Sequence, residues 1–179
     1  IFISKSYSSN YTLTKIVELD EPWGSSFINK NEIIISEKNG KIKIVNIYSA
    51  QILEVKHNLN FLNIGQGGLL DILYKDNSIW VSYSEERVNS KTSTSIAKAK
   101  LDKKELNFEN IFQANPPIDS GYHFGSRLAI KGDYLYASVG ERGKGMIAQD
   151  PKKHPGSIIR IHLDGSIPSD NPKFEGKSD

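Results

Sequence analysis

The chain has 179 residues, of which 37% are hydrophobic and 25% are charged, a composition typical of a folded globular protein rather than a disordered one. Its 23 basic and 21 acidic side chains are interspersed and give a net charge of +2, which argues against nucleic acid or a membrane surface as a partner. There is no cysteine, which excludes disulfides and thiolate chemistry, and no apolar run approaches the ~18 residues of a membrane span.

Short strands are predicted along the whole chain, and helix signals are nearly absent. Runs rich in β-branched and aromatic residues recur, each bounded by Gly, Asn, Asp or Pro. The clearest predicted strands are, in chain order, residues 32–36, 41–45, 78–83, 134–139 and 157–161. Residues 32–36 are continuously apolar, which is typical of a strand covered on both faces.

The predicted strands form a repeat. An apolar strand, a short turn and a second strand occur three times, at residues 27–37, 72–85 and 128–141. The copies end at Glu37, Glu85 and Glu141, which are 48 and 56 residues apart. A third strand follows each copy, and a fourth follows the first two, at 51–56 and 108–113. Four strands at a period of about 40–50 residues are typical of a propeller blade. The alternative is a β-sandwich whose strands resemble one another by chance.

The repeat predicts one all-β domain over residues 1–179, a partial β-propeller with about three blades at approximately 20–66, 67–123 and 124–179. Known propellers close a ring of about four to eight blades. Residues 174–179 contain no strand that would return to seal the first blade. We therefore expect the chain to be part of a longer protein.

Three glycine-rich polar motifs are candidates for a site. Gly-Gln-Gly-Gly-Leu-Leu-Asp at 65–71 and Ser-Gly-Tyr-His-Phe-Gly-Ser-Arg-Leu at 120–128 precede predicted inner strands, and Val-Gly-Glu-Arg-Gly at 139–143 follows one. Glycines around a polar side chain let the backbone approach a ligand closely. The alternative is that the glycines serve tight turns between blades.

His123 is the strongest candidate for a catalytic base. Imidazole has an ordinary pKa of about 6.5, which suits proton abstraction near neutral pH. The residue stands between Tyr122 and Phe124 and close in sequence to Arg127, a cation that would stabilise developing negative charge. The alternative is a buried histidine bonded to the backbone.

Other kinds of site find less support. His57 falls in a polar loop and His154 in a basic turn. His162 alternates out of an apolar strand and is expected to be exposed, and no His-x-x-x-His pair occurs. A Gly-x-Ser-x-Gly elbow and the phosphate-binding glycine loops are also absent from the sequence. A glycosidase-like propeller is an alternative. Glycoside hydrolysis needs paired carboxylates, and the candidates are Glu85, Glu86 and Glu141.

Taken in order, the motifs resemble one family over residues 21–172: the soluble aldose sugar dehydrogenases that use pyrroloquinoline quinone (PQQ), with their glucose/sorbosone dehydrogenase domain. The matching strings are Glu-Pro-Trp-Gly at 21–24, Ile-Ser-Glu at 35–37, Asn-Gly-Lys-Ile at 39–42, Gly-Gln-Gly-Gly-Leu-Leu-Asp at 65–71, Val-Ser-Tyr-Ser at 81–84, Gly-Tyr-His-Phe-Gly-Ser-Arg-Leu at 121–128, Gly-Glu-Arg-Gly at 140–143, Ala-Gln-Asp at 148–150 and Asp-Gly-Ser-Ile-Pro-Ser-Asp-Asn-Pro at 164–172.

The resemblance implies a six-bladed propeller that oxidises an aldose at C1, with PQQ as the hydride acceptor. It implies that His123 matches the catalytic histidine, which takes the proton from the anomeric hydroxyl, and that Gln66 matches a glutamine in the same pocket. Arg142 falls where a loop residue borders the cofactor site. Tyr122 stands where some members carry aspartate, which leaves the preferred sugar open.

The same resemblance implies calcium beside PQQ, a separate electron acceptor and a periplasmic or secreted location. Most calcium ligands and the basic residues that hold the PQQ carboxylates would lie beyond residue 179, with no metal ligand in this part of the chain. We therefore expect little activity from these 179 residues alone. The alternatives are a non-catalytic propeller that serves as a binding module, or an inactive fragment.

Overall fold

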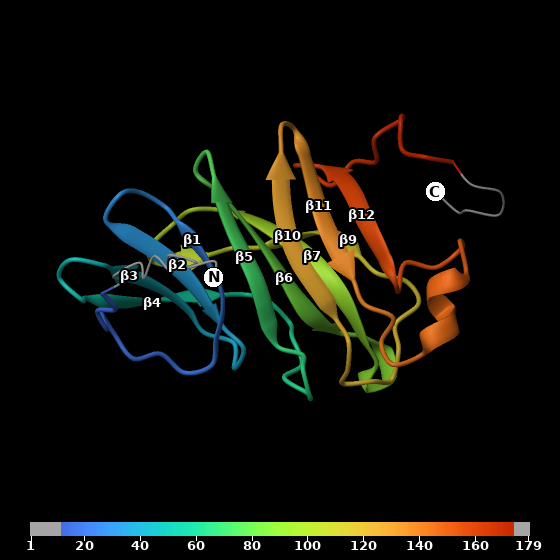
Figure 1. Ribbon diagram of the computed structural model, residues 1–179, viewed down its shortest axis with the longest axis horizontal. Helices are drawn as coiled ribbons and strands as arrows, with labels where there is room; N and C mark the ends of the chain where they lie inside the picture. The colour runs from blue at the N-terminus through green and yellow to red at the C-terminus, as the bar shows by residue number, and fades with distance from the viewer. Residues whose placement is uncertain (1–11, 174–179) are drawn as a thin grey trace, which may run out of the picture.

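The strands form three mainly antiparallel sheets that follow one another along the chain and lie side by side across the molecule (Figure 1). The computed structural model describes residues 12–173, so the prediction that residues 174–179 contain no closing strand lies outside the described residues. No helix among residues 12–173 is long and apolar enough to cross a membrane. The predicted blade boundaries at 20–66, 67–123 and 124–179 stay a prediction.

The sheets differ in their number of strands. The first has the order β1 (Pro22–Phe27), β2 (Glu32–Glu37), β3 (Ile42–Asn46), β4 (Ile52–His57), β8 (Glu105–Leu106). The second has the order β5 (Leu69–Lys75), β6 (Ser78–Glu86), β7 (Thr92–Lys100), β9 (Glu109–Gln113). The third has the order β10 (Gly125–Lys131), β11 (Tyr134–Val139), β12 (Ser157–His162), and two short 3-10 helices, η1 (Val88–Ser90) and η2 (Gly145–Gln149), lie in loops.

The first copy of the repeat begins earlier than predicted. The sequence pattern placed an apolar strand from Phe27 onward, whereas β1 ends at Phe27 and a turn follows it. The side chain of Asn29 accepts the N–H groups of Asn31 and Glu32 at 2.8 and 3.0 Å. This local hydrogen bonding favours the turn that joins β1 to β2.

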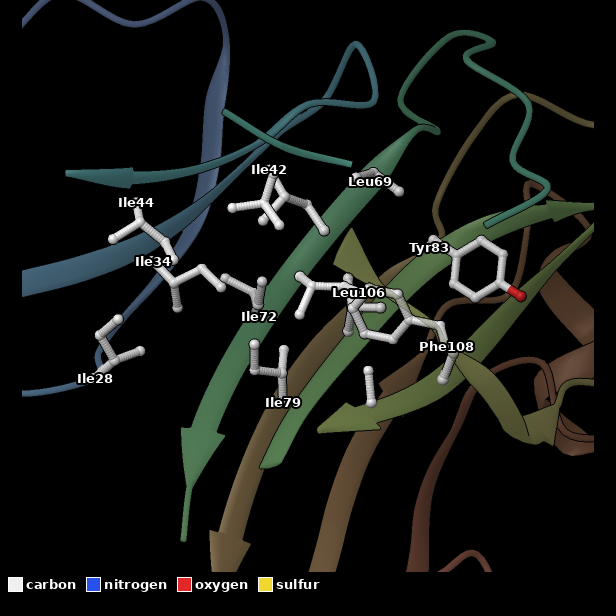
Figure 2. Close-up of a cluster of buried hydrophobic side chains, with 14 residues drawn as sticks. Ile28, Ile34, Ile42, Ile44, Leu69, Ile72, Ile79, Tyr83, Leu106 and Phe108 are labelled. Atoms are coloured by element: carbon white, nitrogen blue, oxygen red, sulfur yellow. The ribbon is translucent and has the colours of Figure 1, made fainter. Parts of the chain in front are cut away.

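Two apolar clusters fill the spaces between neighbouring sheets. Figure 2 shows the larger one, in which Ile34 and Ile42 of the first sheet pack with Ile72 and Ile79 of the second, all fully buried. Burying such a side chain contributes about 1.5–3 kcal/mol. A second cluster around Trp80 joins the second sheet to the third. Each sheet therefore packs its face on the next, as propeller blades do.

The short strand β8 is a feature that the sequence pattern did not predict. It pairs in parallel with β4, although it lies in the connection between β7 and β9 of the second sheet. Leu106 of β8 is fully buried, and Asn58 after β4 accepts the Phe108 N–H and donates to the Phe108 carbonyl, at 2.8 and 3.1 Å. A loop of the second sheet thus completes the outer edge of the first.

A buried serine at the fifth position of the second strand links successive sheets. Ser36 in β2 donates its hydroxyl hydrogen to the Leu70 carbonyl in β5. Ser82 in β6 donates in the same way to the Ser126 carbonyl in β10, at 2.6 Å. Both serines are fully buried, so each bond crosses between sheets away from water.

Replacing Ser82 with alanine is expected to destabilise the protein by about 1–3 kcal/mol, because the Ser126 carbonyl and the Asp71 N–H both lose a buried partner. The midpoint of urea denaturation would measure the loss. Ser49→Ala, in the exposed turn between β3 and β4, is the matched control and should shift the midpoint little. Equal midpoints for the two variants would contradict the role of Ser82.

Candidate functional site

The three glycine-rich motifs meet at one edge of the sheets. β5 and β10 begin, and β11 ends, at the lower edge in Figure 1. There the Gln66 N–H donates to the Gly121 carbonyl at 2.8 Å, and the Arg142 N–H donates to the His123 carbonyl at 3.3 Å. The structure therefore brings together residues that are distant in sequence and come from the ends of all three motifs.

His123 has an unusual backbone conformation that its neighbours hold in place. Its φ of 49° lies in the left-handed region, which a residue with a Cβ adopts only when its surroundings impose it. Its N–H donates to the side-chain oxygen of Gln66 at 2.9 Å, and its carbonyl accepts the N–H of Arg142. These bonds direct the imidazole outward, and its side chain is 54% exposed. His123 is therefore an accessible histidine, not the buried structural one of the alternative interpretation.

The imidazole of His123 is paired with a carboxylate. Its Nδ1 lies 2.5 Å from Glu141 Oε1. The hydrogen bond from His123, together with its charge when protonated, holds the pKa of Glu141 below its usual range, and the N–H of Gly143 adds to the effect. An ionised carboxylate keeps the proton on Nδ1, which leaves the lone pair of Nε2 free to act as a base.

Sequence reasoning did not find the pairing of His123 with Glu141, although the repeat contained a signal. Glu37 and Glu85 end the first two copies of the repeat and are both buried. Glu37 pairs with Lys43 at 2.7 Å, and Glu85 accepts hydrogen bonds from polar side chains of the second sheet: Ser95, Asn110 and Gln113. Among the three closing glutamates, Glu141 alone faces a histidine. Glu85, one of the carboxylates considered for a glycosidase, is bonded within its own sheet, whereas Glu141 is bonded to His123.

Arg142 is buried behind the loop that carries His123. The residue is 2% exposed, and its guanidinium lies 3.6 Å from the centre of the Phe124 ring. It donates to the Tyr122 carbonyl at 2.9 Å, the Thr92 carbonyl at 3.0 Å and the Thr92 hydroxyl at 2.6 Å. Burial lowers the pKa of Arg142 to about 10, so it stays charged at neutral pH. The expected position of Arg142 at the cofactor site stays a prediction.

The other residues near His123 behave differently from one another. Tyr122 is 60% exposed, and its ring lies edge-on to the imidazole with 6.3 Å between ring centres. Arg127, expected as the cationic neighbour of His123, points its guanidinium to Asp71 of β5, with 3.5 Å between Nε and Oδ2. The structure thus places an aromatic ring beside the imidazole and gives Arg127 another partner.

The remaining histidines have structural partners. His57 lies at the end of β4, not in a loop, with Nε2 2.7 Å from the Gly40 carbonyl. His154 accepts the N–H of Asn115 at 2.9 Å. His162 is half-buried against Tyr134 rather than exposed as expected, because the two residues are directly paired across β11 and β12. Among residues 12–173, no group of three or more His, Asp or Glu side chains is arranged to hold a metal ion.

The chain is similar in sequence and fold to known proteins. The sequence matches the glucose/sorbosone dehydrogenase family over residues 19–179. Aldose sugar dehydrogenase YliI of Escherichia coli strain K12 is 31% identical over 165 aligned residues, which cover 87% of this chain and 44% of that protein.

Two solved structures share the fold. The soluble aldose sugar dehydrogenase from Escherichia coli in the apo-form superposes with a TM-score of 0.83 at 31% identity, over 89% of this chain and 50% of that one. The PQQ-bound form of the aldose sugar dehydrogenase from Streptomyces coelicolor gives 0.77 at 25% identity, over 89% and 49%.

These structures are β-propeller sugar dehydrogenases, so the prediction of an all-β propeller is confirmed. The chain spans about half the length of the relatives that it matches. The family match over residues 19–179 and the three packed sheets lead to the same conclusion. The chain belongs to the glucose/sorbosone dehydrogenase family of PQQ-dependent sugar dehydrogenases.

Proposed function

We propose that the full-length protein oxidises aldose sugars at C1, with PQQ as the hydride acceptor and His123 as the general base. The observation that carries the proposal is the accessible imidazole of His123, bonded through Nδ1 to Glu141. A carboxylate in this position fixes the ring and stabilises the imidazolium that forms when Nε2 accepts a proton. The family supports the same reaction class.

Three residues of the chain have separate roles in the proposed reaction. His123 Nε2 removes the proton of the anomeric hydroxyl, and Glu141 holds the ring while the charge develops. Gln66 fixes the His123 backbone through its oxygen, and its amide nitrogen is offered to a sugar hydroxyl. PQQ, when bound, supplies the carbon that accepts the hydride from C1, so that the sugar leaves as the lactone.

The described residues fit the sugar side of such a site better than the cofactor side. The guanidinium of Arg142, a buried cation next to the site, already donates to Thr92, Ser120 and Tyr122. We propose that the residues that hold the PQQ carboxylates, and those that bind calcium to polarise its carbonyls, come from later blades. We also propose a separate electron acceptor and a periplasmic or secreted location.

The proposal is tested by reconstituting the full-length protein with PQQ and calcium chloride and following dye reduction with an aldose. Turnover is expected only when PQQ, calcium and sugar are all present. A well-folded, PQQ-saturated protein that oxidises no aldose would contradict the proposal. The chain of residues 1–179 alone should show little turnover, and the effect of PQQ on its melting temperature would report any binding.

Replacing Glu141 with glutamine is expected to lower kcat by at least about 10-fold, because the neutral amide cannot stabilise the imidazolium.

The contact between Glu141 and His123 also depends on pH. Since His123 holds the pKa of Glu141 below its usual range, the pair persists as pH falls through that range and is lost only as pH falls through the lowered value. Carboxyl NMR titration would follow Glu141, and its pKa should rise in His123→Ala. For Glu141→Gln, the matched control is Glu54→Gln, an exposed change in β4.

Replacing Tyr122 with aspartate is expected to change the ratio of kcat/KM between two aldoses by about 10-fold or more, because an exposed ring beside the base becomes a charged acceptor. A panel of aldoses that differ at one hydroxyl would measure the ratio. Tyr122→Phe, which keeps the ring, should keep the wild-type order of preference. An unchanged order in Tyr122→Asp would place the sugar away from this side chain.

A further inference from the structure

Arg142 is a buried cation whose hydrogen bonds all go to neutral groups. Its Nη1 donates to the Thr92 carbonyl at 3.0 Å, and its Nη2 donates to the Thr92 hydroxyl at 2.6 Å and to the Ser120 carbonyl. Its Nε donates to the Tyr122 carbonyl at 2.9 Å. Burying a guanidinium without a hydrogen-bonded carboxylate is costly, and stacking on the Phe124 ring offsets only part of that cost. A cation kept under these conditions calls for a specific role.

Two of the residues that Arg142 binds precede the proposed base in its loop, and the third lies in the second sheet. Ser120 and Tyr122 belong to the loop that leads into His123. Thr92 is the first residue of β7, and it exchanges backbone hydrogen bonds with Ile118 at 2.9 and 3.0 Å. The planar guanidinium thus ties Ser120 and Tyr122 to the start of β7, while the Thr92 backbone holds Ile118 at the same place.

The backbone of Arg142 acts on the same loop. Its φ of 58° is left-handed, as is that of His123, and its N–H donates to the His123 carbonyl at 3.3 Å. The preceding residue is Glu141, which holds the imidazole. Three consecutive contacts of one short segment, through the Glu141 side chain, the Arg142 backbone and the Arg142 side chain, therefore fix where His123 lies.

We propose that Arg142 is a positioning residue for His123: its buried guanidinium fixes the loop through Thr92, Ser120 and Tyr122 and does not grip the cofactor. This assignment differs from the role at the cofactor border that the family resemblance implies for Arg142. The expected effect of Arg142 on turnover rests on the proposed function, whereas its expected effect on the position of His123 does not.

The test compares Arg142→Lys, Thr92→Val and Thr92→Ser in the full-length protein. Arg142→Lys keeps a positive charge but loses the planar fork, and is expected to lower kcat about 10- to 100-fold, the effect of misplacing a catalytic group by about 1 Å. Thr92→Val removes only the hydroxyl and should lower kcat about 3- to 10-fold. Thr92→Ser restores the hydroxyl and should recover most of the rate. KM and the Kd for PQQ should stay within about twofold in all three.

A second readout does not depend on turnover. In the protein without cofactor, a displaced His123 no longer bonds Glu141, so the pKa of Glu141 should rise toward its usual range in Thr92→Val and stay low in Thr92→Ser. Thr92→Val alters no charge, so the shift would report geometry alone. If the wild-type protein oxidises no aldose, the proposed function fails while this titration still decides the positioning role.

Two results would overturn the inference. One is a rise in the Kd for PQQ in Arg142→Lys as large as the fall in kcat, which would make Arg142 a cofactor contact. The other is a Thr92→Val protein whose kcat and Glu141 titration both match those of Thr92→Ser. Should Arg142→Lys fail to fold, the pair of Thr92 variants gives the answer without it.

Discussion

Replacing His123 with alanine is expected to lower kcat for aldose oxidation about 10²- to 10⁴-fold, the range in which a positioned general base contributes. The expectation rests on geometry, since the imidazole is 54% exposed and its Nδ1 is held by Glu141 at 2.5 Å. With that nitrogen occupied, Nε2 is the lone pair available to a bound sugar.

In His123→Ala, the fall in kcat should not be accompanied by weaker binding of PQQ. The His123 backbone, which Gln66 and Arg142 hold, is unchanged by removal of the imidazole, so the Kd for PQQ should change little. Free imidazole in the buffer should restore part of the rate, because the space left by the side chain opens to solvent. His162→Ala deletes the same group from β12 and is the matched control. A PQQ-bound His123→Ala protein with wild-type kcat would rule out the base assignment.

Replacing Gly140 with alanine is expected to have the second large effect, on both stability and turnover. A Cβ on Gly140 would lie 1.9 Å from the carbonyl oxygen of His123 and 2.5 Å from its carbonyl carbon. Both are backbone atoms with no flexible side chain to move aside. The Gly140 N–H also donates to the Phe124 carbonyl at 3.0 Å, so the two segments cannot separate without losing that bond.

The clash must therefore displace the His123 loop or unpair it from the end of β11. We expect a loss of about 1–3 kcal/mol in the free energy of unfolding, as in overpacked interiors. We also expect kcat to fall about 100-fold from misplacement of the base. Urea denaturation and steady-state kinetics on the same preparation would measure the two effects.

Gly132→Ala is the control for the backbone effect of alanine. Gly132 lies in the turn between β10 and β11 with a φ of +60°, and a Cβ there would meet no atom within 4 Å. Alanine at this position should cost about 1 kcal/mol of stability from its left-handed conformation alone and leave kcat unchanged. If Gly140→Ala had no larger effect on kcat than Gly132→Ala, the close packing around His123 would not govern catalysis.

The strands were predictable because their signals are local. β11 was predicted at its observed bounds, and β2, β3, β6 and β12 to within a few residues, since alternating or continuous apolar runs occupy them. The start of β1 was missed because residues 22–26, Pro-Trp-Gly-Ser-Ser, form neither an alternating nor a continuous apolar run. β8 was missed because two residues have no periodicity and its partner β4 is far along the chain.

The site was only partly predictable. The family resemblance implied that Gln66, Tyr122, His123 and Arg142 belong to one pocket, and these residues are linked by hydrogen bonds in the structure. It did not follow from the motifs that His123 faces Glu141, or that Arg142 is buried against Thr92. Those contacts join residues 18 and 50 positions apart, and their formation depends on how the loops of the sheets meet.

The sequence by itself determined the strand repeat, the all-β class and the family, because apolar period, turn residues and motif order are properties of short stretches of chain. Only the tertiary structure decided the chemical environment of His123. Its outward imidazole, its carboxylate partner and its left-handed backbone arise where loops attached to neighbouring sheets pack together, and the packing of those sheets sets the distances between groups that the sequence keeps far apart.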